Sequence, residues 1–479
     1  MSIQRVQLSP SLTVSRVITG LWQIADMEKE GQRLELSKLA NAMLPYAKAG
    51  LTTFDMADHY GSAEDIAGLF SKQHPEVTVQ RMTKWVPTPG PISKAEVRHA
   101  VERSLKRLKT EQLDLLQFHT WSYTDPSWLD CLFYLQELKE EGLIANLGLT
   151  NFDTAHLNMV LQSGIDIVSN QLSFSLIDQR AAGAMSELCL KHGVKLLAYG
   201  TLAGGLLSER WLGKAEPDST ANWSQSKYKR FIEVAGGWQG FQELLKVLAD
   251  VSKDQQVSIA NLASRYILEQ QAVGAVIIGA RLGSSEHLAD TLKLFTFSIT
   301  EANKKKIAAA LQNLKAIPGD CGDEYRKPPF LTASGDLSHH LEAFPAPYKT
   351  KVINDKTHAL SGTVWEDLAG YSRAVRQGKR ILISGTTATH KDRVIGGKDP
   401  AAQTHFVIDK LGGGLQSLGA SLDNVIRTRV YIKHMSDWEA IARAHGERFK
   451  EILPANTLIR ADLVGDDYLV EMEAEAELP

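Results

Sequence analysis

The 479-residue sequence is constrained first by the motifs that it lacks. It contains no G-x-G-x-x-G following a strand-like segment and no phosphate loop ending in G-K-[ST], so Rossmann-type and nucleoside-triphosphate binding lack their fingerprints. Its three cysteines, Cys131, Cys189 and Cys321, form no C-x-x-C and do not cluster with histidines. We therefore expect a reducing compartment and no metal site.

Excess charge and long apolar segments are also missing. The formal net charge is only −3, so no basic field exists to attract nucleic acid or an anionic membrane. No apolar run approaches the roughly 20 residues that span a bilayer, and MSIQRVQLSP lacks the pattern of a signal peptide. The expectation is a cytoplasmic protein whose partners are small molecules or protein subunits.

The length and the order of the predicted elements indicate two domains. Single cores rarely grow beyond about 300 residues. Strand-like runs alternate with amphipathic helices up to residue 317, which predicts an α/β fold of the (β/α)8 TIM-barrel type. A Pro- and Gly-rich stretch at 318–349 is interpreted as a linker, and 350–479 as a smaller α+β domain. The eight candidate barrel strands are residues 15–22, 52–57, 77–84, 113–119, 144–151, 165–173, 194–200 and 273–280.

Four residues with complementary acid–base chemistry follow three successive predicted strands. Asp55 and Tyr60 lie in TTFDMADHYG, Lys84 in VTVQRMTKW and His119 in LDLLQFHTW. In a parallel α/β barrel the carboxyl ends of the strands meet on one face, where catalytic groups gather. A lysine held by an aspartate would stabilise a tyrosine phenolate, which suits a proton donor to a nascent alkoxide, while a neutral histidine could orient a carbonyl.

The order and context of these four residues resemble the aldo-keto reductase family, with Asp55, Tyr60, Lys84 and His119 as its tetrad. The resemblance implies reduction of a small-molecule carbonyl with NADPH, NADH being possible, and a small hairpin at residues 6–14 closing the barrel base. It also assigns Thr150, Asn151 and Gln171 to the nicotinamide. The segment 276–292, with Gly279 and Arg281, resembles the part that binds the adenine end; His287 and Thr291 depart from the usual pattern.

Each of these residues also has an ordinary structural interpretation. A strand-end aspartate can cap a turn, a buried histidine can bond a backbone carbonyl, and a lone Arg281 can be a surface arginine. Trp22, Trp85 and Trp121 each follow a predicted strand; they either wall the substrate pocket or pack at the barrel rim. It is the combination of the four, in family order, that favours an enzyme.

The second domain resembles the Rid (reactive intermediate deaminase, RidA-like) family through GYSRAVRQGKRILISGTTA, AQTHFVIDKL and PANTLIRADLV. The resemblance implies a trimer through this domain and a possible second cleft with Tyr371, Ser384 and Glu471. Imine-hydrolysing members carry arginine where this chain has Asn456, and an amide cannot replace a guanidinium that grips a carboxylate. Arg460 could substitute only from the same side of its strand. The domain is therefore either an imine or enamine hydrolase feeding the barrel, or a binding or assembly module.

Overall fold

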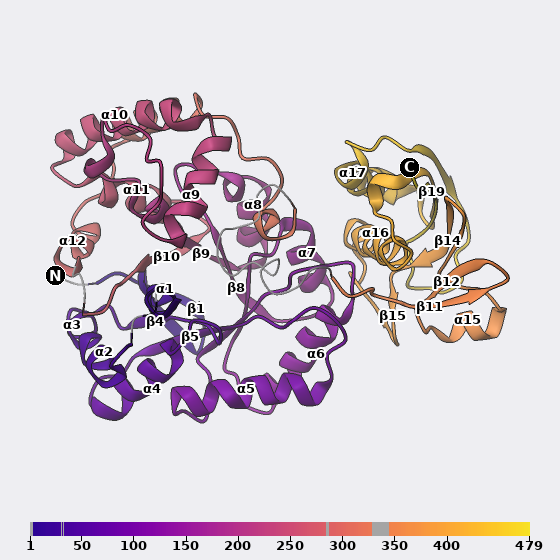
Figure 1. Ribbon diagram of the computed structural model, residues 1–479, viewed down its shortest axis with the longest axis horizontal. Helices are drawn as coiled ribbons and strands as arrows, with labels where there is room; N and C mark the ends of the chain where they lie inside the picture. Colours follow the sequence, from indigo (N-terminus) through magenta and orange to yellow (C-terminus); the bar gives the residue numbers. More distant parts are fainter. Residues whose placement is uncertain (1–2, 30, 32, 284–286, 328–343) are drawn as a thin grey trace.

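The computed structural model describes residues 3–29, 31, 33–283, 287–327 and 344–479. Residues 284–286 of the segment assigned to the adenine end, and 328–343 of the predicted linker, lie outside the described residues. Figure 1 shows a helix-wrapped barrel beside a smaller domain built from a sheet and two long helices. The fold class predicted from the sequence is confirmed.

The barrel closes with its eight parallel strands in the order β10-β3-β4-β5-β6-β7-β8-β9. All eight predicted strands are present. They are β3 (Val17–Gly20), β4 (Thr53–Asp55), β5 (Gln80–Trp85), β6 (Leu115–Phe118), β7 (Leu147–Thr150), β8 (Ile167–Ser173), β9 (Lys195–Tyr199) and β10 (Val273–Gly279). Nearly every strand residue is buried, because side chains on one face fill the interior and those on the other pack against helices.

The helices around the barrel follow the predicted alternation. They are α1 (Trp22–Lys29), α2 (Leu36–Ala42), α3 (Leu44–Lys48), α4 (Ala63–Gln73), α5 (Lys94–Leu108), α6 (Ser127–Glu140), α7 (Thr154–Gln162), α8 (Ala184–His192), α9 (Trp223–Val234), α10 (Gly237–Gln255), α11 (Ile259–Leu268), α12 (Leu288–Leu292), α13 (Glu301–Leu311) and α14 (Asp323–Arg326). Helix α5 begins with the expected capping box, in which Ser93 and Glu96 each accept a hydrogen bond from the other's backbone N–H. Across the described ranges, no helix combines the length and apolar character that crossing a membrane requires.

A two-stranded hairpin closes the base of the barrel. Strands β1 (Arg5–Ser9) and β2 (Leu12–Ser15) pair antiparallel, as the resemblance implied. Leu8, Leu12 and Val14 of this hairpin join one apolar cluster with interior residues such as Ile18 and Met82. Because the hairpin closes this end, we expect a ligand-binding site at the opposite end of the barrel.

The C-terminal domain has a seven-stranded sheet in the order β11-β12-β13-β14-β19-β17-β18. Its elements are β11 (Lys349–Ile353), β12 (Lys356–Leu360), α15 (Val364–Ala369), β13 (Ala374–Gln377), β14 (Arg380–Thr387), β15 (Thr389–His390), β16 (Arg393–Val394), α16 (Pro400–Ser417), β17 (Val425–Ile432), α17 (Trp438–Phe449), β18 (Ala455–Arg460) and β19 (Val470–Glu477). The sequence pattern predicts β14, β17, β19 and both long helices. The strand expected to carry Asn456 and Arg460 is β18, whose residues are mostly exposed.

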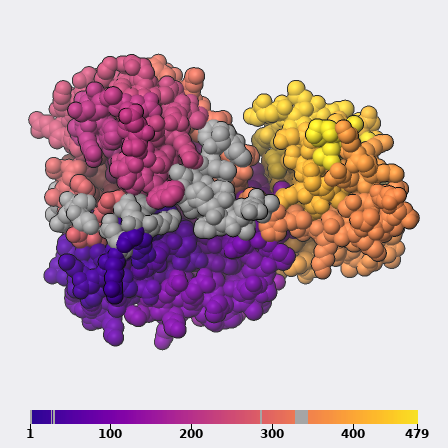
Figure 2. Space-filling model, viewed as in Figure 1, coloured from indigo at the N-terminus to yellow at the C-terminus, as the bar shows by residue number. Residues whose placement is uncertain are grey.

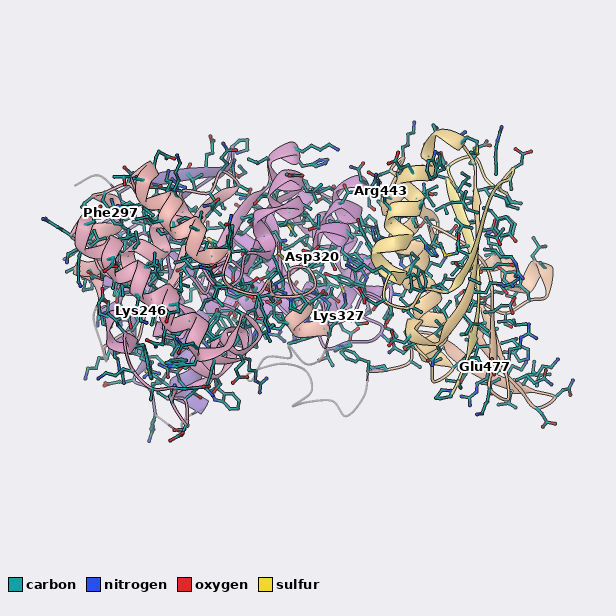
Figure 3. The ribbon with its side chains drawn as sticks, turned by 90° about the horizontal axis from the view of Figure 1, so that it is seen from above. Lys246, Phe297, Asp320, Lys327, Arg443 and Glu477 are labelled. Carbon is teal, nitrogen blue, oxygen red and sulfur yellow. The ribbon has the colours of Figure 1, made fainter. Side chains whose placement is uncertain are left out.

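The two domains meet where α16 packs against α7 of the barrel. The Gly412–Gly414 triplet lies inside α16 at this contact: a Cβ on Gly413 would stand 2.6 Å from the Thr124 carbonyl oxygen of the barrel. A glycine triplet in the sequence is compatible with either close packing or a helix break, and here it allows close packing. In the space-filling view the orange C-terminal domain borders the purple part of the barrel (Figure 2). The two long helices α16 and α17 therefore lie on the side of the sheet toward the barrel, and the sheet lies beyond them (Figure 3).

Candidate active site

The four predicted catalytic residues line one cavity of about 440 Å³ at the open end of the barrel. Asp55 is the last residue of β4, Lys84 is the last residue but one of β5, and His119 directly follows β6. Tyr60 comes from the loop after β4. Parallel pairing of β4, β5 and β6 brings these strand ends together, so residues 64 positions apart in the chain share one wall.

Lys84 and Asp55 form a buried ion pair below the cavity. Lys84 Nζ lies 2.6 Å from Asp55 Oδ2, and both residues are 3% exposed. Two amide groups hold the other carboxylate oxygen: Gln117 Nε2 donates at 3.1 Å and Gln171 Nε2 at 2.7 Å to Oδ1. Because every bond to Asp55 comes from a donor, the carboxylate is fixed as an anion and fixes the ammonium in turn.

Tyr60 lies against this pair. Lys84 Nζ is 4.8 Å from the centre of the Tyr60 ring, and Trp22 contacts the ring edge-on at 4.9 Å. Burial, followed by the charge of Asp55, raises the pKa of Tyr60 well above its ordinary value. Burial lowers the pKa of Lys84, although Asp55 opposes that change. Tyr60 consequently holds its proton at neutral pH and can act as an acid.

The His119 ring is neutral and has one unpartnered nitrogen. Burial, together with the charge of Arg326, lowers its pKa well below the ordinary value. Nδ1 lies 3.2 Å from the Thr150 carbonyl oxygen, which can only accept, so Nδ1 carries the proton in that contact. Nε2 is buried without a hydrogen-bond partner among the described residues. In this tautomer Nε2 accepts a bond from a hydroxyl, and moving the proton from Nδ1 to Nε2 lets it donate to a carbonyl.

The residues assigned to the nicotinamide cofactor also line the cavity, which includes Thr150, Asn151, Gln171, Gly279 and Arg281. Asn151 has a left-handed backbone (φ 57°), and its Oδ1 accepts a 2.7 Å bond from the hydroxyl of Tyr199. A Cβ on Gly279 would stand 2.5 Å from the Gln23 amide, so a larger residue there would displace the Gln23 side chain. The amides of Asn151 and Gln171 line the cavity beside the unpartnered His119 Nε2. These groups suit a nicotinamide ring and a substrate oxygen.

The three tryptophans are placed differently. Trp22 and Trp121 line the cavity, and Trp121 meets the His119 ring edge-on at 4.7 Å. Trp85 instead packs on Phe118 at 5.7 Å within the apolar core. Two of the three rings thus form the wall near the tetrad.

Sequence reasoning missed a second group of cavity residues. Tyr199 ends β9, Lys227 lies in α9, and Tyr325 lies in α14, where the chain returns across the barrel. Figure 3 labels Asp320 and Lys327, the ends of this returning segment, on the side of the barrel toward the C-terminal domain. Tyr199 lies in a predicted strand, but Lys227 lies in an insertion between strands and Tyr325 in a Pro- and Gly-rich stretch, and no local periodicity marks these two as part of the site.

The returning segment is attached by buried charge. Arg180 Nη2 donates to Asp178 Oδ2 at 2.7 Å and to Glu324 Oε2 at 2.9 Å. Arg326 Nη1 donates to the Asn151 carbonyl at 2.7 Å and Nη2 to the Thr120 carbonyl at 2.6 Å. Residues 320–327 therefore form part of the wall next to His119.

In the C-terminal domain, three of the four candidate cleft residues share a region. Tyr371 precedes β13, Ser384 lies in β14, and Glu471 in β19 pairs with Thr387 of β14. Asn456 lies on β18, separated from β19 by β17, and its Nδ2 donates to the hydroxyl of Thr428 at 2.9 Å. No hydrogen bond or ion pair of the described residues joins Asn456 to the other three.

Comparison with known proteins agrees with both halves of the structure. Residues 16–312 match the family model described as Aldo/keto reductase family, and residues 358–478 match the model described as Endoribonuclease L-PSP. The barrel is similar to the NADH-specific methylglyoxal reductase of Escherichia coli, with 25% identity over 63% of this chain and 97% of that protein. A glycerol dehydrogenase from Gluconobacter oxydans shares the fold, with 22% identity, a TM-score of 0.54 and coverage of 67% of this chain and 98% of that one.

An uncharacterized protein of Streptomyces coelicolor is similar to the C-terminal domain, with 37% identity over 24% of this chain and 87% of that protein. The match of the first family model covers more than half of the chain. The protein therefore belongs to the aldo/keto reductase family of NAD(P)H-dependent oxidoreductases, and it carries a Rid/L-PSP-family domain after the barrel.

Proposed function

We propose that the barrel reduces an aldehyde or ketone to an alcohol, or runs the reverse reaction, with Tyr60 as the proton donor. The observation that carries this proposal is the 2.6 Å Lys84–Asp55 pair under Tyr60, in the same cavity as the unpartnered Nε2 of His119. A proton donor, its supporting cation and a group that orients oxygen are the parts that carbonyl reduction needs.

Each residue then has one role. Tyr60 gives its proton to the oxygen that becomes the alcohol, and Lys84 stabilises the phenolate that remains. Asp55, held by Gln117 and Gln171, keeps Lys84 in position. His119 Nε2 orients the substrate oxygen. When bound, the reduced nicotinamide supplies the hydride.

We further propose NADPH as the preferred cofactor, with Thr150, Asn151 and Gln171 at the nicotinamide and Arg281 at the 2′-phosphate. The support is that Arg281 lines the same cavity as the tetrad, beyond Gly279 at the end of β10. A guanidinium suits a phosphate because it offers a fork of donors. One relative is named as NADH-specific, so the cofactor must be measured directly.

The test is a titration of the full chain with NADPH and NADH by nicotinamide fluorescence, followed by oxidation of each cofactor across a panel of aldehydes and ketones. The proposal expects NADPH binding and turnover of at least one carbonyl compound. Binding of neither nucleotide would contradict it.

For the C-terminal domain we propose a non-catalytic assembly or binding module at 350–479, after the barrel at 1–317 and the predicted linker at 318–349, of which residues 320–327 pack on the barrel. Two observations favour this over imine or enamine hydrolysis. Asn456 turns to Thr428 instead of offering a cation, and α16 is packed against the barrel. Leu382, Ile426 and Ile459 are 44%, 50% and 48% exposed on the sheet, where Arg429 also pairs with Glu473 and Glu475. Exposed apolar side chains of this kind support a homotrimer formed through the module.

Two measurements test this second proposal. Light scattering of the full chain should give the mass of three subunits, and a monomer mass would contradict the trimer. An imine made in solution from an amino acid should not be hydrolysed faster with the protein than without it. Acceleration that persists in a Tyr60→Phe variant would instead establish a hydrolytic second site.

A further inference from the structure

A second lysine lies in the cavity wall. Lys227 projects from α9, in the insertion after β9, and is 8% exposed although it carries an ammonium group. It lines the same cavity as Tyr60 and His119. The proposed chemistry of the tetrad assigns it no role.

The partners of Lys227 are aromatic rather than acidic. Its Nζ donates to the Tyr325 hydroxyl at 2.8 Å and to the Tyr199 hydroxyl at 3.5 Å. It also lies 4.7 Å from the centre of the Tyr199 ring and 5.5 Å from that of Tyr228. Within the described ranges, no carboxylate oxygen lies within 4.0 Å of Nζ.

The nearby carboxylate does not contact this ammonium directly. Glu324 contributes to the electrostatic field at Lys227, yet its Oε2 is bound by Arg180 at 2.9 Å. Burial lowers the pKa of Lys227, but Tyr325, Tyr228 and Glu324 more than compensate, so the ammonium stays charged. Lys84 in the same cavity differs from Lys227, because Lys84 Nζ forms an ion pair with Asp55 Oδ2 at 2.6 Å.

A buried ammonium that contacts no carboxylate oxygen can still bind an anion, because ring faces and hydroxyls satisfy only part of its charge. An anion brought by a ligand would complete the pairing. From this arrangement we propose that Lys227 binds a carboxylate carried by the carbonyl substrate, so that the enzyme prefers carbonyl acids over neutral carbonyl compounds. This inference rests on the proposed reductase function and names its substrate class.

The position of Tyr325 limits how long such a substrate is. Its hydroxyl contacts Lys227, while its ring meets the His119 ring edge-on at 5.5 Å and the Trp121 ring at 6.1 Å. One aromatic ring thus contacts both the carbonyl-orienting residue and the cation. A short molecule with a few bonds or one ring between carbonyl and carboxylate can reach His119 and Lys227 together.

The cofactor is the other source of an anion, since the residues assigned to it line the same cavity as Lys227. The experiment must therefore separate the two. We would compare 4-carboxybenzaldehyde with its neutral methyl ester as substrates for the wild type, Lys227→Met and the control Lys229→Met. Lys229 lies two residues along the same helix and pairs with Glu216 and Glu233.

The wild type should show a higher kcat/KM for the acid than for the ester. In Lys227→Met the acid-to-ester ratio should fall by about 10- to 100-fold, the usual worth of a charged hydrogen bond, mainly through KM. Lys229→Met should keep the wild-type ratio. Wild-type reduction of both compounds without preference for the acid would overturn the inference while leaving the reductase function intact.

Two further results complete the test. Weaker NADPH binding in Lys227→Met with an unchanged acid-to-ester ratio would assign Lys227 to the cofactor and overturn the inference. A second measurement needs no variant: benzoate should inhibit wild-type aldehyde reduction competitively, and benzamide should not. Equal inhibition by both would also overturn it. Failure of the wild type to reduce either aldehyde or any carbonyl of the panel would instead count against the proposed function.

Discussion

Replacing His156 by leucine should loosen the barrel from the C-terminal domain. His156 in α7 is 4% exposed, and both ring nitrogens face carboxylates. Nδ1 lies 2.7 Å from Asp153 Oδ1, and Nε2 lies 2.8 Å from Asp409 Oδ2 of α16. The ring stacks on Tyr123 with the centroids 3.4 Å apart. His156 is therefore a cation bridging two buried anions from different domains.

The expected loss in the free energy of unfolding follows from the charges that the substitution leaves unpaired. Removing one partner of a buried ion pair costs about 3–5 kcal/mol, because the remaining charge is unpaired. Arg448 Nη2 still lies 2.8 Å from Asp409 Oδ1, an ion pair without hydrogen-bond geometry, so the low end applies. Losing the stack on Tyr123 adds about 1 kcal/mol. We expect a total of about 4 kcal/mol.

The assay is calorimetric unfolding of the full chain, because a two-domain protein need not unfold in one step. His156→Leu should lower the transition in which the domains separate. His99→Leu, at an exposed position on α5, is the matched control and should change little. An unfolding profile of His156→Leu that matches the wild type would refute the reasoning.

The same contact should depend on pH with a defined sign. Burial lowers the pKa of His156, but Asp153 and Asp409 outweigh it and raise the pKa above the ordinary 6.5. A raised pKa means that the stabilisation is complete below the unfolded value and is lost as pH rises through the folded value. The pKa of Asp409 is lowered despite burial, through Arg448 and His156, so its contribution is lost only in acid. The wild-type minus His156→Leu difference in stability should therefore shrink at alkaline pH.

Three further predictions concern the site and the domain contact. Arg281→Ala should weaken NADPH binding by about 10- to 100-fold and NADH binding little in fluorescence titrations; equal losses would remove Arg281 from the 2′-phosphate. Because the pKa of Tyr60 is raised, carbonyl reduction should stay constant through neutral pH while alcohol oxidation rises with pH, and a fall in reduction through neutral pH would contradict this. Gly413→Val should lower the melting temperature more than Gly446→Val, since only the first Cβ would meet another atom.

The barrel and its tetrad could be predicted because their signals are local. Each barrel strand is an apolar run, and Asp55, Lys84 and His119 stand where such runs end. The contribution of Lys227 and Tyr325 could not be predicted in this way. They reach the cavity only because an insertion and a returning segment fold over the barrel mouth, and neither carries a strand or helix period that points there.

The domain contact was equally inaccessible from the sequence. His156 lies on a helix whose periodicity marks a buried face but not which surface covers it. The Gly412–Gly414 triplet suggested either close packing or a helix break, and only the position of Thr124 distinguishes the two. Long-range pairings such as His156 with Asp409, 253 residues apart, depend on how two finished domains dock.

The central claim is that Tyr60 gives the proton in carbonyl reduction. Its most direct test is the rate of NADPH oxidation by Tyr60→Phe with a carbonyl compound that the wild type reduces, measured beside the NADPH dissociation constant of both proteins. We predict an unchanged dissociation constant and a fall in kcat of at least about 100-fold, the usual contribution of a positioned acid. Turnover by Tyr60→Phe at the wild-type rate would contradict the account.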